Sequence, residues 1–363
     1  MKSSHGKSRF ISLVVVLVAA LCTLLWAGSH PVHAKDKPII LRVASPFPAP
    51  PADVSRFFMK WVDRVKERSG GRVDFKYFWG GSLVTAPESL SMLSNRSFDI
   101  GIVCWLYQPG ITPLGTVDWA VPFNTEDCTR STLAKKKLFE EVPEVMQELT
   151  RHKVKPFLWH AMGPYWLYTK FPINTLDDLK GKKIGCSGRD IPVYVKATGA
   201  IPVTNVVAEK YEMLQRGVTE GECMSFFYMT DYKVYEVVKH LYDVNVSRSV
   251  TSVYCIHDDA WNSLPQDIQK IMLEEAPEAE KWQCSMEPGW TQEHLKKWRD
   301  AKVTIGTLPD KEIVKWADLI KEHPQNWANE CEKKGLPGKK VMKHYIKLLE
   351  RLGEKMPVKY VIQ

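Results

Sequence analysis

The residue types best suited to binding a ligand gather at positions 186–190, where a predicted strand gives way to a predicted helix. Arg189 carries a planar guanidinium, which binds carboxylates through two parallel hydrogen bonds. The backbone N–H groups of Ser187 and Gly188 can add an anion-binding nest. A second interpretation stays open, in which Asp190 and Ser187 cap the helix and Arg189 faces solvent. The first interpretation predicts anion binding.

Strands and short helices alternate around these residues. Residues 178–184 read as a turn and a strand, residues 199–203 end a helix and start a second strand, and residues 218–221 lead into a third. This alternation is typical of βαβ units with a parallel sheet. Ligands of such sheets bind beyond the carboxyl ends of the strands, near helix N-termini. Residues 186–190 and 223–227 are therefore predicted to line a site.

The rest of the chain fits an α/β protein with two such halves. Phe57, Phe58, Trp61, Val62 and Val65 follow helical spacing after Asp53, which can cap that helix. Further segments are assigned from apolar periodicity and from glycine and proline positions. The predicted strands are 41–44, 73–78, 98–103, 154–159, 167–169 and 250–257, the last returning to the first half; the predicted helices are 87–93, 129–150, 232–241 and most of 261–353.

The first 34 residues are predicted to be a cleaved export signal. Lys2, Lys7 and Arg9 precede an uncharged apolar run of 16 residues, and residues 32–34 resemble a signal-peptidase site. The alternative is an uncleaved anchor, but a membrane-spanning helix needs about 20 residues. We therefore expect a mature periplasmic chain that begins at Lys35 and is not embedded in the membrane.

Composition argues against several functions. Removing 34 of the 363 residues leaves 329, enough for about two domains, and lowers the formal net charge from +8 to +5 because three basic residues are lost. This charge is scattered, so no nucleic-acid partner is expected. Motifs for nucleophilic elbows, zinc proteases, phosphate loops, dinucleotides and calcium are absent from the sequence. We therefore expect no catalytic residue, no metal and no cofactor.

Seven cysteines remain after position 34, at 104, 128, 186, 223, 255, 284 and 331. An odd number in an oxidising compartment predicts at least one free thiol. No two cysteines have C-x-x-C spacing, which argues against a zinc site or a redox dithiol. Cys186 and Cys223 both follow predicted strands; a disulfide between them stays open, although two buried thiols are favoured.

The central stretch resembles the solute-binding proteins of TRAP transporters, the DctP-type family. Residues 178–184 match the family pattern D-L-K-G-x-K-[IL], residues 199–203 match G-A-x-P-[VT], and residues 209–221 match E-x-Y-x-x-L-Q-x-G-x-x-D/E-G. Shorter family motifs match in the same order, so the resemblance covers nearly the whole mature chain. These are residues 69–73, 80–83, 97–101, 122–123, 235–239 and 261–265.

The resemblance implies two doubly wound α/β domains around a ligand cleft, with hinge strands and a long bracing helix. On that basis we expect residues 35–161 plus about 247–290 in domain I, and residues 162–246 plus about 291–363 in domain II. Family members close on a small solute, usually a carboxylate, and deliver it to membrane permease subunits. We therefore expect a monomeric receptor for a small organic acid, with TRAP-type permease subunits as partners and no enzymatic activity.

Four positions that commonly contact the ligand in this family differ here. Family members generally have an Arg directly after the D-L-K-G-x-K-[IL] strand, and this chain has Gly185 at that position. Many have a second Arg about 20 residues earlier, where this chain has Tyr165. A family Asn is replaced by Met224 and a family aromatic residue by Val207. Because fork-like recognition of a carboxylate is hard to replace, either Arg189 holds the acid or the ligand is neutral, aromatic or metal-complexed.

Aromatic residues at strand ends are the remaining candidates, since such side chains suit a pocket for a flat or apolar ligand. For each of them a role in the core stays open. An exported enzyme is a third hypothesis, for which only His160 and Cys186 are available. The predicted ligand-binding residues are Arg189, Gly185, Cys186, Ser187, Tyr165, Trp166, Met224, Phe226, Phe227, Trp105, Trp159 and Phe47.

Overall fold

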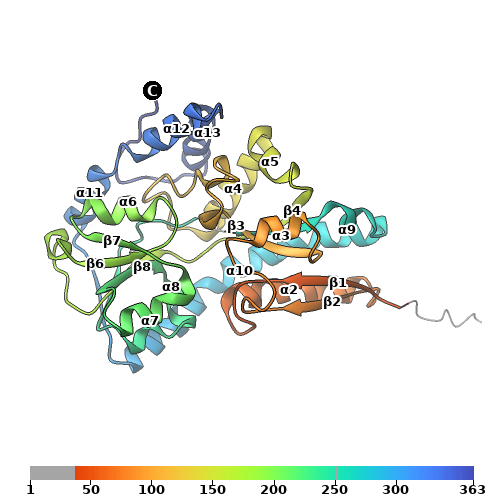
Figure 1. Cartoon of the computed structure of the whole chain (residues 1–363), viewed down its shortest axis with the longest axis horizontal. Helices are drawn as coiled ribbons and strands as arrows, with labels where there is room; N and C mark the ends of the chain where they lie inside the picture. Colours follow the sequence, from red (N-terminus) through yellow and green to blue (C-terminus); the bar gives the residue numbers. More distant parts are fainter. Residues whose placement is uncertain (1–36, 250–251) are drawn as a thin grey trace, which may run out of the picture. The chain divides into compact units, whose positions relative to one another are not determined.

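Two β-sheets organise this computed structural model, which describes residues 37–249 and 252–363 (Figure 1). The predicted export signal, residues 1–34, lies outside the described residues. Among those that are described, no helix has both the length and the apolarity needed to cross a membrane. Residues 40–363 belong to one unit of contacts.

The first sheet is built mainly from the early part of the chain. Its order is β2 (Val73–Phe78), β1 (Ile39–Ala44), β3 (Ile100–Cys104), β10 (Ser252–His257) and β4 (Val154–His160). β1 and β3 are parallel, and β10 runs antiparallel between β3 and β4. The predicted return of the chain to the first half is therefore confirmed for residues 252–257.

The second sheet has the order β11 (Thr304–Thr307), β9 (His240–Asp243), β5 (Tyr165–Thr169), β8 (Gly221–Ser225), β6 (Lys183–Cys186) and β7 (Ile201–Thr204). β6 is parallel to both β7 and β8, as the alternating pattern predicts, and α6 (Ile191–Ala197) and α7 (Lys210–Gln215) lie between them in sequence. β5 is antiparallel to its neighbours. The α/β class is confirmed, although both sheets are mixed.

Helix α2 (Asp53–Arg68) shows why the apolar spacing matters. Its predicted face of Phe57, Phe58 and Trp61 is fully buried, and the indole of Trp61 donates to the Met272 carbonyl at 3.0 Å. The prediction that Asp53 caps this helix is wrong. The N-cap residue is Ala52, and the Asp53 carboxylate binds Arg56 instead.

Helix α10 (Gln266–Asp300) is the long bracing helix. Its Glu280 carboxylate accepts the Trp159 backbone N–H of β4 at 3.0 Å. Its Trp298 indole donates to Thr230 in α8 (Phe226–Asp231) at 2.7 Å, next to the second sheet. The helix therefore contacts elements attached to both sheets.

The two sheets are also joined by two short connections, residues 161–164 and 244–249. These connections run side by side: the Met162 N–H donates to the Ser249 carbonyl at 3.2 Å, and the Tyr165 N–H donates to the Ser247 carbonyl at 2.9 Å. Few backbone segments therefore link the halves. The domain boundaries given above stay a prediction.

Three predictions of local structure are wrong. Residues 129–150 form two helices, α4 (Cys128–Glu141) and α5 (Pro143–Thr150), because Pro143 starts a new helix and disfavours helical geometry at Val142. Residues 232–241 contain only a short turn before β9, since Lys233 has a positive φ of 54°. β11 interrupts the predicted helical end of the chain.

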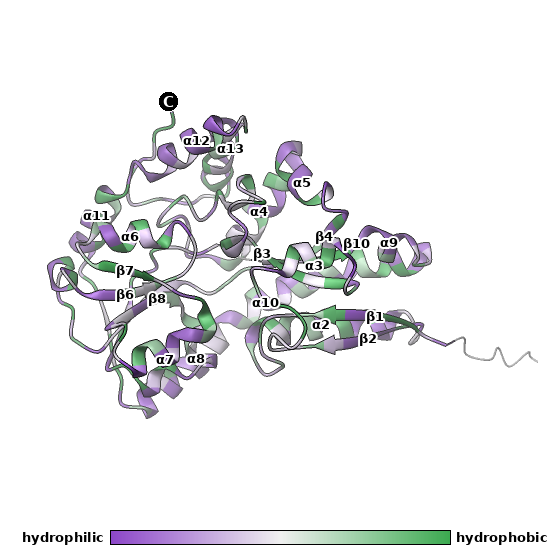
Figure 2. Cartoon of the chain, in the orientation of Figure 1, coloured by the Kyte–Doolittle hydropathy of each residue, from purple (hydrophilic) through white to green (hydrophobic). Residues whose placement is uncertain are grey.

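The remaining helices cover the sheets and carry one buried face each. In Figure 2 green and purple residues lie next to each other along α13, in line with its buried Val341, Tyr345 and Leu348. The other helices have these bounds: α3 (Ser89–Ser94), α9 (Asp258–Asn262), α11 (Asp310–Leu319), α12 (His323–Lys333) and α13 (Gly338–Arg351).

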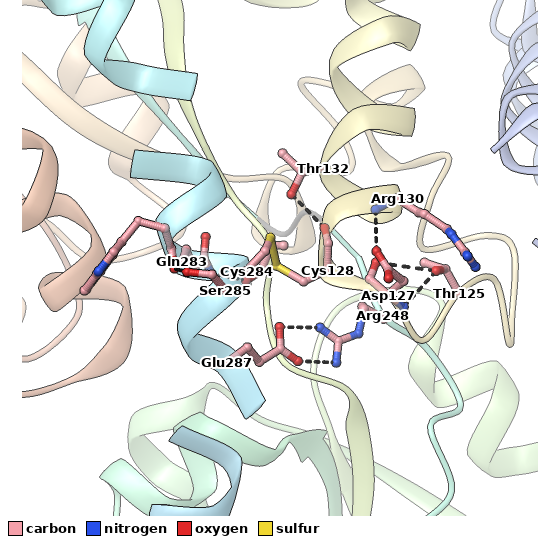
Figure 3. Close-up of a disulfide and its surroundings, with 12 residues drawn as sticks. Thr125, Asp127, Cys128, Arg130, Thr132, Arg248, Gln283, Cys284, Ser285 and Glu287 are labelled. Atoms are coloured by element: carbon pink, nitrogen blue, oxygen red, sulfur yellow. Dashed lines mark hydrogen bonds and ion pairs between the residues drawn. A yellow bond between two sulfur atoms is a disulfide. The ribbon is translucent and has the colours of Figure 1, made fainter. Parts of the chain in front are cut away.

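A disulfide joins Cys128 of α4 to Cys284 of α10, 156 residues apart (Figure 3). Next to it the Arg248 guanidinium binds both oxygens of Glu287, at 2.9 and 2.6 Å. The sequence did not indicate this pairing. Cys186 and Cys223 are among the five buried free thiols of the described residues, which confirms the expectation of at least one unpaired cysteine and decides against a bond between those two.

Candidate functional site

The ends of β6 and β7 meet the turn η1 (Trp105–Tyr107), which follows β3 of the first sheet. A cavity of about 410 Å³ lies at this junction. Since ligands of α/β proteins bind beyond the carboxyl ends of strands, this cavity is the candidate site. It is lined by Leu106, Tyr107 and Pro109 on one side and by Gly188, Arg189, Thr204, Asn205, Val206 and Glu209 on the other.

A larger cavity of about 840 Å³ lies elsewhere, beside the ends of β9 and β11. Its lining carries five carboxylates, including Asp243 and Glu354, against the two basic residues Arg130 and Lys355. None of the predicted ligand-binding residues lines it. An excess of carboxylates does not favour an acidic ligand, so we do not assign the site here.

Gly185, where the resemblance led us to expect an arginine, faces a buried carboxylate. It lies in β6 directly opposite Glu222 of β8, and a Cβ atom at Gly185 would collide with the Glu222 carboxylate. Glu222 in turn accepts a bond from Lys210 Nζ at 2.7 Å, and both side chains are fully buried. Thr219 and Asn205 bind the same carboxylate at 2.9 and 3.2 Å. An internal ion pair therefore occupies the space beside Gly185.

Arg189 is partly exposed, and its guanidinium already has carboxylate partners. It lies 3.1 Å from Asp190 and 3.5 Å from Glu330 of α12. The Asp190 carboxylate also lies 2.8 Å from Nε2 of His323. The Asp190 side chain makes no capping hydrogen bond to α6. Arg189 thus borders the cavity while bound to side chains of its own protein.

The predicted anion nest is covered by an apolar side chain. Gly188 has a φ of +76°, a conformation that favours glycine, and the Leu106 side chain packs against its Cα. Ser187 is fully buried, and its hydroxyl donates to the Asn205 carbonyl at 2.7 Å. The neighbouring Cys186 is a buried thiol whose pKa burial raises to about 12.

Tyr107, which lines the cavity, is one of four neighbouring residues whose buried hydroxyl groups have no hydrogen-bond partner among the described residues. They are the phenols of Tyr107, Tyr165 and Tyr228 and the hydroxyl of Ser225. Ser225 lies opposite Tyr165 in the pairing of β5 with β8. Burial, and then the nearby Tyr107 phenol, raises the pKa of Tyr165 well above its usual value. Unpartnered buried polar atoms are rare and invite an explanation.

Aromatic rings surround this hydroxyl cluster, which we define as Tyr107, Tyr165, Ser225 and Tyr228. The Phe47 ring stacks on Tyr228 with centroids 5.1 Å apart, and Trp119 meets Tyr165 edge-on at 5.1 Å. The Phe227 ring packs against the backbone of Gly163 in the connection between the halves. The structure therefore brings Phe47, Tyr165 and Phe227 of the predicted set together with the cluster.

Other predicted residues lie further into the protein. Trp105 and Trp159 stack on each other at 5.8 Å within the core of the first half. Trp166 packs on Phe226 at 4.2 Å, and Met224 lies opposite Trp166 with 1% exposure. These five residues have packing roles in the structure, and their predicted contact with a ligand stays a prediction.

His160 and Cys186, the residues considered for catalysis, are poorly placed for it. Burial lowers the pKa of His160 to about 3, and its Nδ1 lies 3.3 Å from the Ser252 hydroxyl. A neutral thiol with a pKa of about 12 is a poor nucleophile at neutral pH.

Sequence reasoning missed Ser225, Tyr228, Lys210 and Glu222. A signal for Glu222 was available, because it interrupts the otherwise uncharged and fully buried strand β8, whereas Lys210 lies in a polar helix and gave none. Ser225 was within the predicted wall of residues 223–227 but was not singled out. Tyr228 gave no local signal, since an aromatic residue in a short helix most often packs in a core.

Two α/β halves joined by short paired connections and a long helix, with a site at the strand ends between them, define a hinged solute-binding protein. Residues 52–330 match the family model described as bacterial extracellular solute-binding protein, family 7 (DctP). The chain belongs to this family, which comprises the solute-binding proteins of TRAP transporters. The family is one of receptors for small molecules and works in the periplasm.

Characterised relatives have low identity over most of their length. The C4-dicarboxylate-binding protein DctB of Bacillus subtilis is 23% identical over 326 residues, covering 84% of this chain and 90% of the relative. The C4-dicarboxylate-binding periplasmic protein DctP of Rhodobacter capsulatus is 23% identical over 297 residues, covering 80% and 86%.

Solved structures share the fold. A TRAP solute-binding protein from a marine metagenome, specific for aromatic acid ligands and bound to 3-hydroxybenzoate, has a TM-score of 0.79 at 21% identity, covering 87% of this chain and 99% of the other. A TRAP solute-binding protein from Rhodoferax ferrireducens T118 with copurified benzoate has the same TM-score and identity, covering 87% and 98%. At this identity the likeness supports the fold alone.

Proposed function

We propose that this chain is the extracytoplasmic receptor of a TRAP-type transporter and that its solute is a small aromatic molecule bound between the two halves. After residues 1–34 are removed on export, the mature chain binds the solute in the periplasm and delivers it to membrane permease subunits. The observation that carries the choice of solute is the hydroxyl cluster, in which four buried hydroxyls have no partner among the described residues.

The chemistry of the cluster supports an aromatic solute with one or more oxygen substituents. Phenol and serine hydroxyls can each donate or accept a hydrogen bond, and the rings of Phe47 and Trp119 next to them suit a flat apolar surface. The solved relatives with bound benzoate and 3-hydroxybenzoate are compatible with such a solute. A fork-like arginine at position 185 is not required for it.

A small organic acid held by Arg189 is the second candidate. The observation that favours it is the position of Arg189 on the wall of the 410 Å³ cavity. To bind the acid, Arg189 would exchange Glu330, whose side chain is 57% exposed, for the ligand carboxylate. An exposed ion pair contributes little to stability, so this exchange is inexpensive.

A thermal-shift screen separates the two candidates. The mature protein, freed of co-purified ligand, is tested against neutral aromatics, aromatic acids, aliphatic carboxylates and sulfonates. A ligand at 100 times its Kd stabilises the native state by about 2.7 kcal/mol. The proposal predicts a shift with aromatic compounds that Y165F and Y228F weaken and R189A leaves unchanged.

The control variant is Y211F. Tyr211 is partly exposed and does not line the cavity, and its hydroxyl donates to Glu236 at 2.9 Å. Its removal should leave every ligand shift unchanged. If only carboxylates give a shift and R189A abolishes it, the aromatic proposal fails and the second candidate replaces it. If no compound in any class gives a shift, both candidates fail.

A further inference from the structure

Three helices converge beside Phe227, whose ring meets the His294 ring edge-on with centroids 5.2 Å apart. Asp53 begins α2, Asp231 ends α8, and His294 lies in α10. Each residue offers one ligand atom, and the three atoms all lie within 4.8 Å of one another. Because positions 53, 231 and 294 are far apart in sequence, no spacing motif could have predicted this cluster.

All three side chains have a buried polar atom without a hydrogen-bond partner among the described residues. These atoms are Asp53 Oδ2, Asp231 Oδ2 and His294 Nδ1. Asp53 is 2% exposed and His294 is 1% exposed, and His294 Nε2 lies 3.4 Å from Asp53 Oδ2. Leaving buried polar groups unpaired is costly. A cation shared by the two carboxyl groups would satisfy the unpaired oxygens of Asp53 and Asp231, with one ring nitrogen of His294 as its third ligand.

The surrounding charges do not supply that partner. Arg56 binds Oδ1 of Asp53 and leaves Oδ2 free. Arg56 also lies 3.9 Å from Glu293, and Lys297 lies 3.3 Å from Glu293. The basic side chains Arg56 and Lys297 thus face the carboxyl groups of Asp53, Asp231 and Glu293.

We propose that Asp53, Asp231 and His294 bind one divalent transition-metal ion, with Zn²⁺ and Mn²⁺ as the candidates. An imidazole nitrogen with two carboxylate oxygens is a donor set for such ions. Ca²⁺ and Mg²⁺ prefer oxygen ligands throughout and fit the histidine poorly. Donor atoms at about 2.0–2.2 Å from a metal lie closer together than 4.8 Å, so binding draws the three side chains slightly inward.

Such a metal would tie together elements of both halves. α2 packs on the first half, α8 directly follows β8 of the second sheet, and α10 contacts both. Bound metal would therefore stabilise the arrangement in which Asp53 and Asp231 are close. The proposal does not depend on the identity of the solute, because metal binding is measured without any solute present.

The test uses the mature, oxidised chain after removal of metals with EDTA and dialysis. Zn²⁺, Mn²⁺, Ca²⁺ and Mg²⁺ are titrated separately by calorimetry, and Co²⁺ serves as a visible-absorption probe. We expect one equivalent of Zn²⁺ or Mn²⁺ to bind, with a Co²⁺ spectrum that reports nitrogen and oxygen ligands. D53N, D231N and H294Q should each weaken binding by more than about tenfold, since even outer-shell partners contribute that much.

Two variants control for adventitious binding. D300N removes an exposed carboxylate from the same helix, and H344Q removes a surface histidine that lies 2.9 Å from Glu141. Both should bind metal like the wild type. Melting curves of the metal-free variants show whether each one folds. If H294Q does not fold, metal binding by D231N, a change at a half-buried position, tests the proposal instead.

Three results would overturn the proposal: no uptake of Zn²⁺ or Mn²⁺ by the wild type, equal uptake by the wild type and all three site variants, or loss of binding in H344Q alone. Preference for Ca²⁺ over Zn²⁺ and Mn²⁺ would overturn the assignment to a transition metal.

Discussion

Lys210 Nζ lies 2.7 Å from Glu222 Oε2, and both side chains are completely shielded from solvent. The pair stands beside Gly185, and the Glu222 carboxylate is close enough to forbid a Cβ atom there. The glycine at position 185 and this internal pair are therefore two aspects of one arrangement. The positive charge at this place belongs to Lys210, and its partner is a residue of the protein itself.

Breaking this pair from one side should destabilise the fold. Replacing Lys210 by Met leaves Glu222 buried without its cation, which typically costs about 3–5 kcal/mol. The double variant K210M/E222L should recover much of that loss, because it leaves no buried charge. Urea unfolding curves measure both changes. As a control, E220Q breaks the half-exposed Lys182–Glu220 pair at 3.1 Å and should change stability by less than about 1 kcal/mol.

Gly185→Ala tests the contact with Glu222 directly. We expect a loss of about 1–3 kcal/mol, because the added methyl group must displace a buried, fully hydrogen-bonded carboxylate. In the K210M/E222L background the same change should cost less unfolding free energy, because the obstructing carboxylate is gone. A double-mutant cycle gives the coupling energy between the two sites.

The matched control is Gly289→Ala. Gly289 lies inside α10 with open space around its Cα, so alanine should stabilise the protein by up to about 1 kcal/mol through helix propensity. Equal effects of the same change at positions 185 and 289 would contradict the predicted role of Glu222.

The hydroxyl cluster predicts opposite effects on stability and on binding. Tyr165→Phe and Tyr228→Phe remove buried hydroxyls that have no partner among the described residues, so the ligand-free protein should melt at the same temperature or higher. The same variants should bind the solute more weakly. Calorimetric melting with and without ligand measures both quantities. A marked loss of stability in the ligand-free variants would mean that the hydroxyls serve the fold.

His160 should make stability depend on pH below neutrality. Burial lowers its pKa from 6.5 to about 3 in the folded protein, so between these values the unfolded chain binds a proton that the native state cannot. Its contribution is complete above pH 6.5 and is lost as the pH falls, by at most about 1.4 kcal/mol per pH unit.

His160→Gln should flatten this dependence. The measurement is the difference in unfolding free energy between wild type and variant from pH 5 to 7. We compare wild type with variant because two other groups also make stability depend on pH in this range. Burial raises the pKa of Asp231 to about 7 and that of Asp243 to about 6, so these carboxyl groups increase stability as the pH falls, opposite to His160. H344Q, at a surface position, serves as the reference. Parallel curves for all three proteins would contradict the assignment to His160.

Local pattern was enough to predict much of the fold. The helical spacing from Phe57 to Val65 and the turns around Gly181 and Gly199 report on contacts within a few residues, and both are confirmed. Pro143 was a local signal that was overlooked, and it divides the long predicted helix. β11 lacks a strong pattern because it is a short edge strand with little buried surface.

The site was less accessible from sequence because its features arise from contacts over long distances. Lys210 meets Glu222 across a helix and a strand, and Asp53, Asp231 and His294 come from three helices. Arg189 lines the candidate cavity, and its carboxylate partner Glu330 lies 141 residues away in the sequence. Residue type and spacing therefore could not predict the hydrogen-bonding partners of the candidate residues, and their contact with a ligand stays a prediction.

The bond between Cys128 and Cys284 also determines how the protein has to be produced. Material folded in a reducing cytoplasm would hold seven thiols after position 34, whereas exported material would keep the five that are free in the structure. Alkylation under denaturing conditions followed by mass spectrometry tells these two populations apart. Only the exported form has α4 covalently fixed to the helix that contacts both sheets, so only that form represents the receptor as it meets its solute.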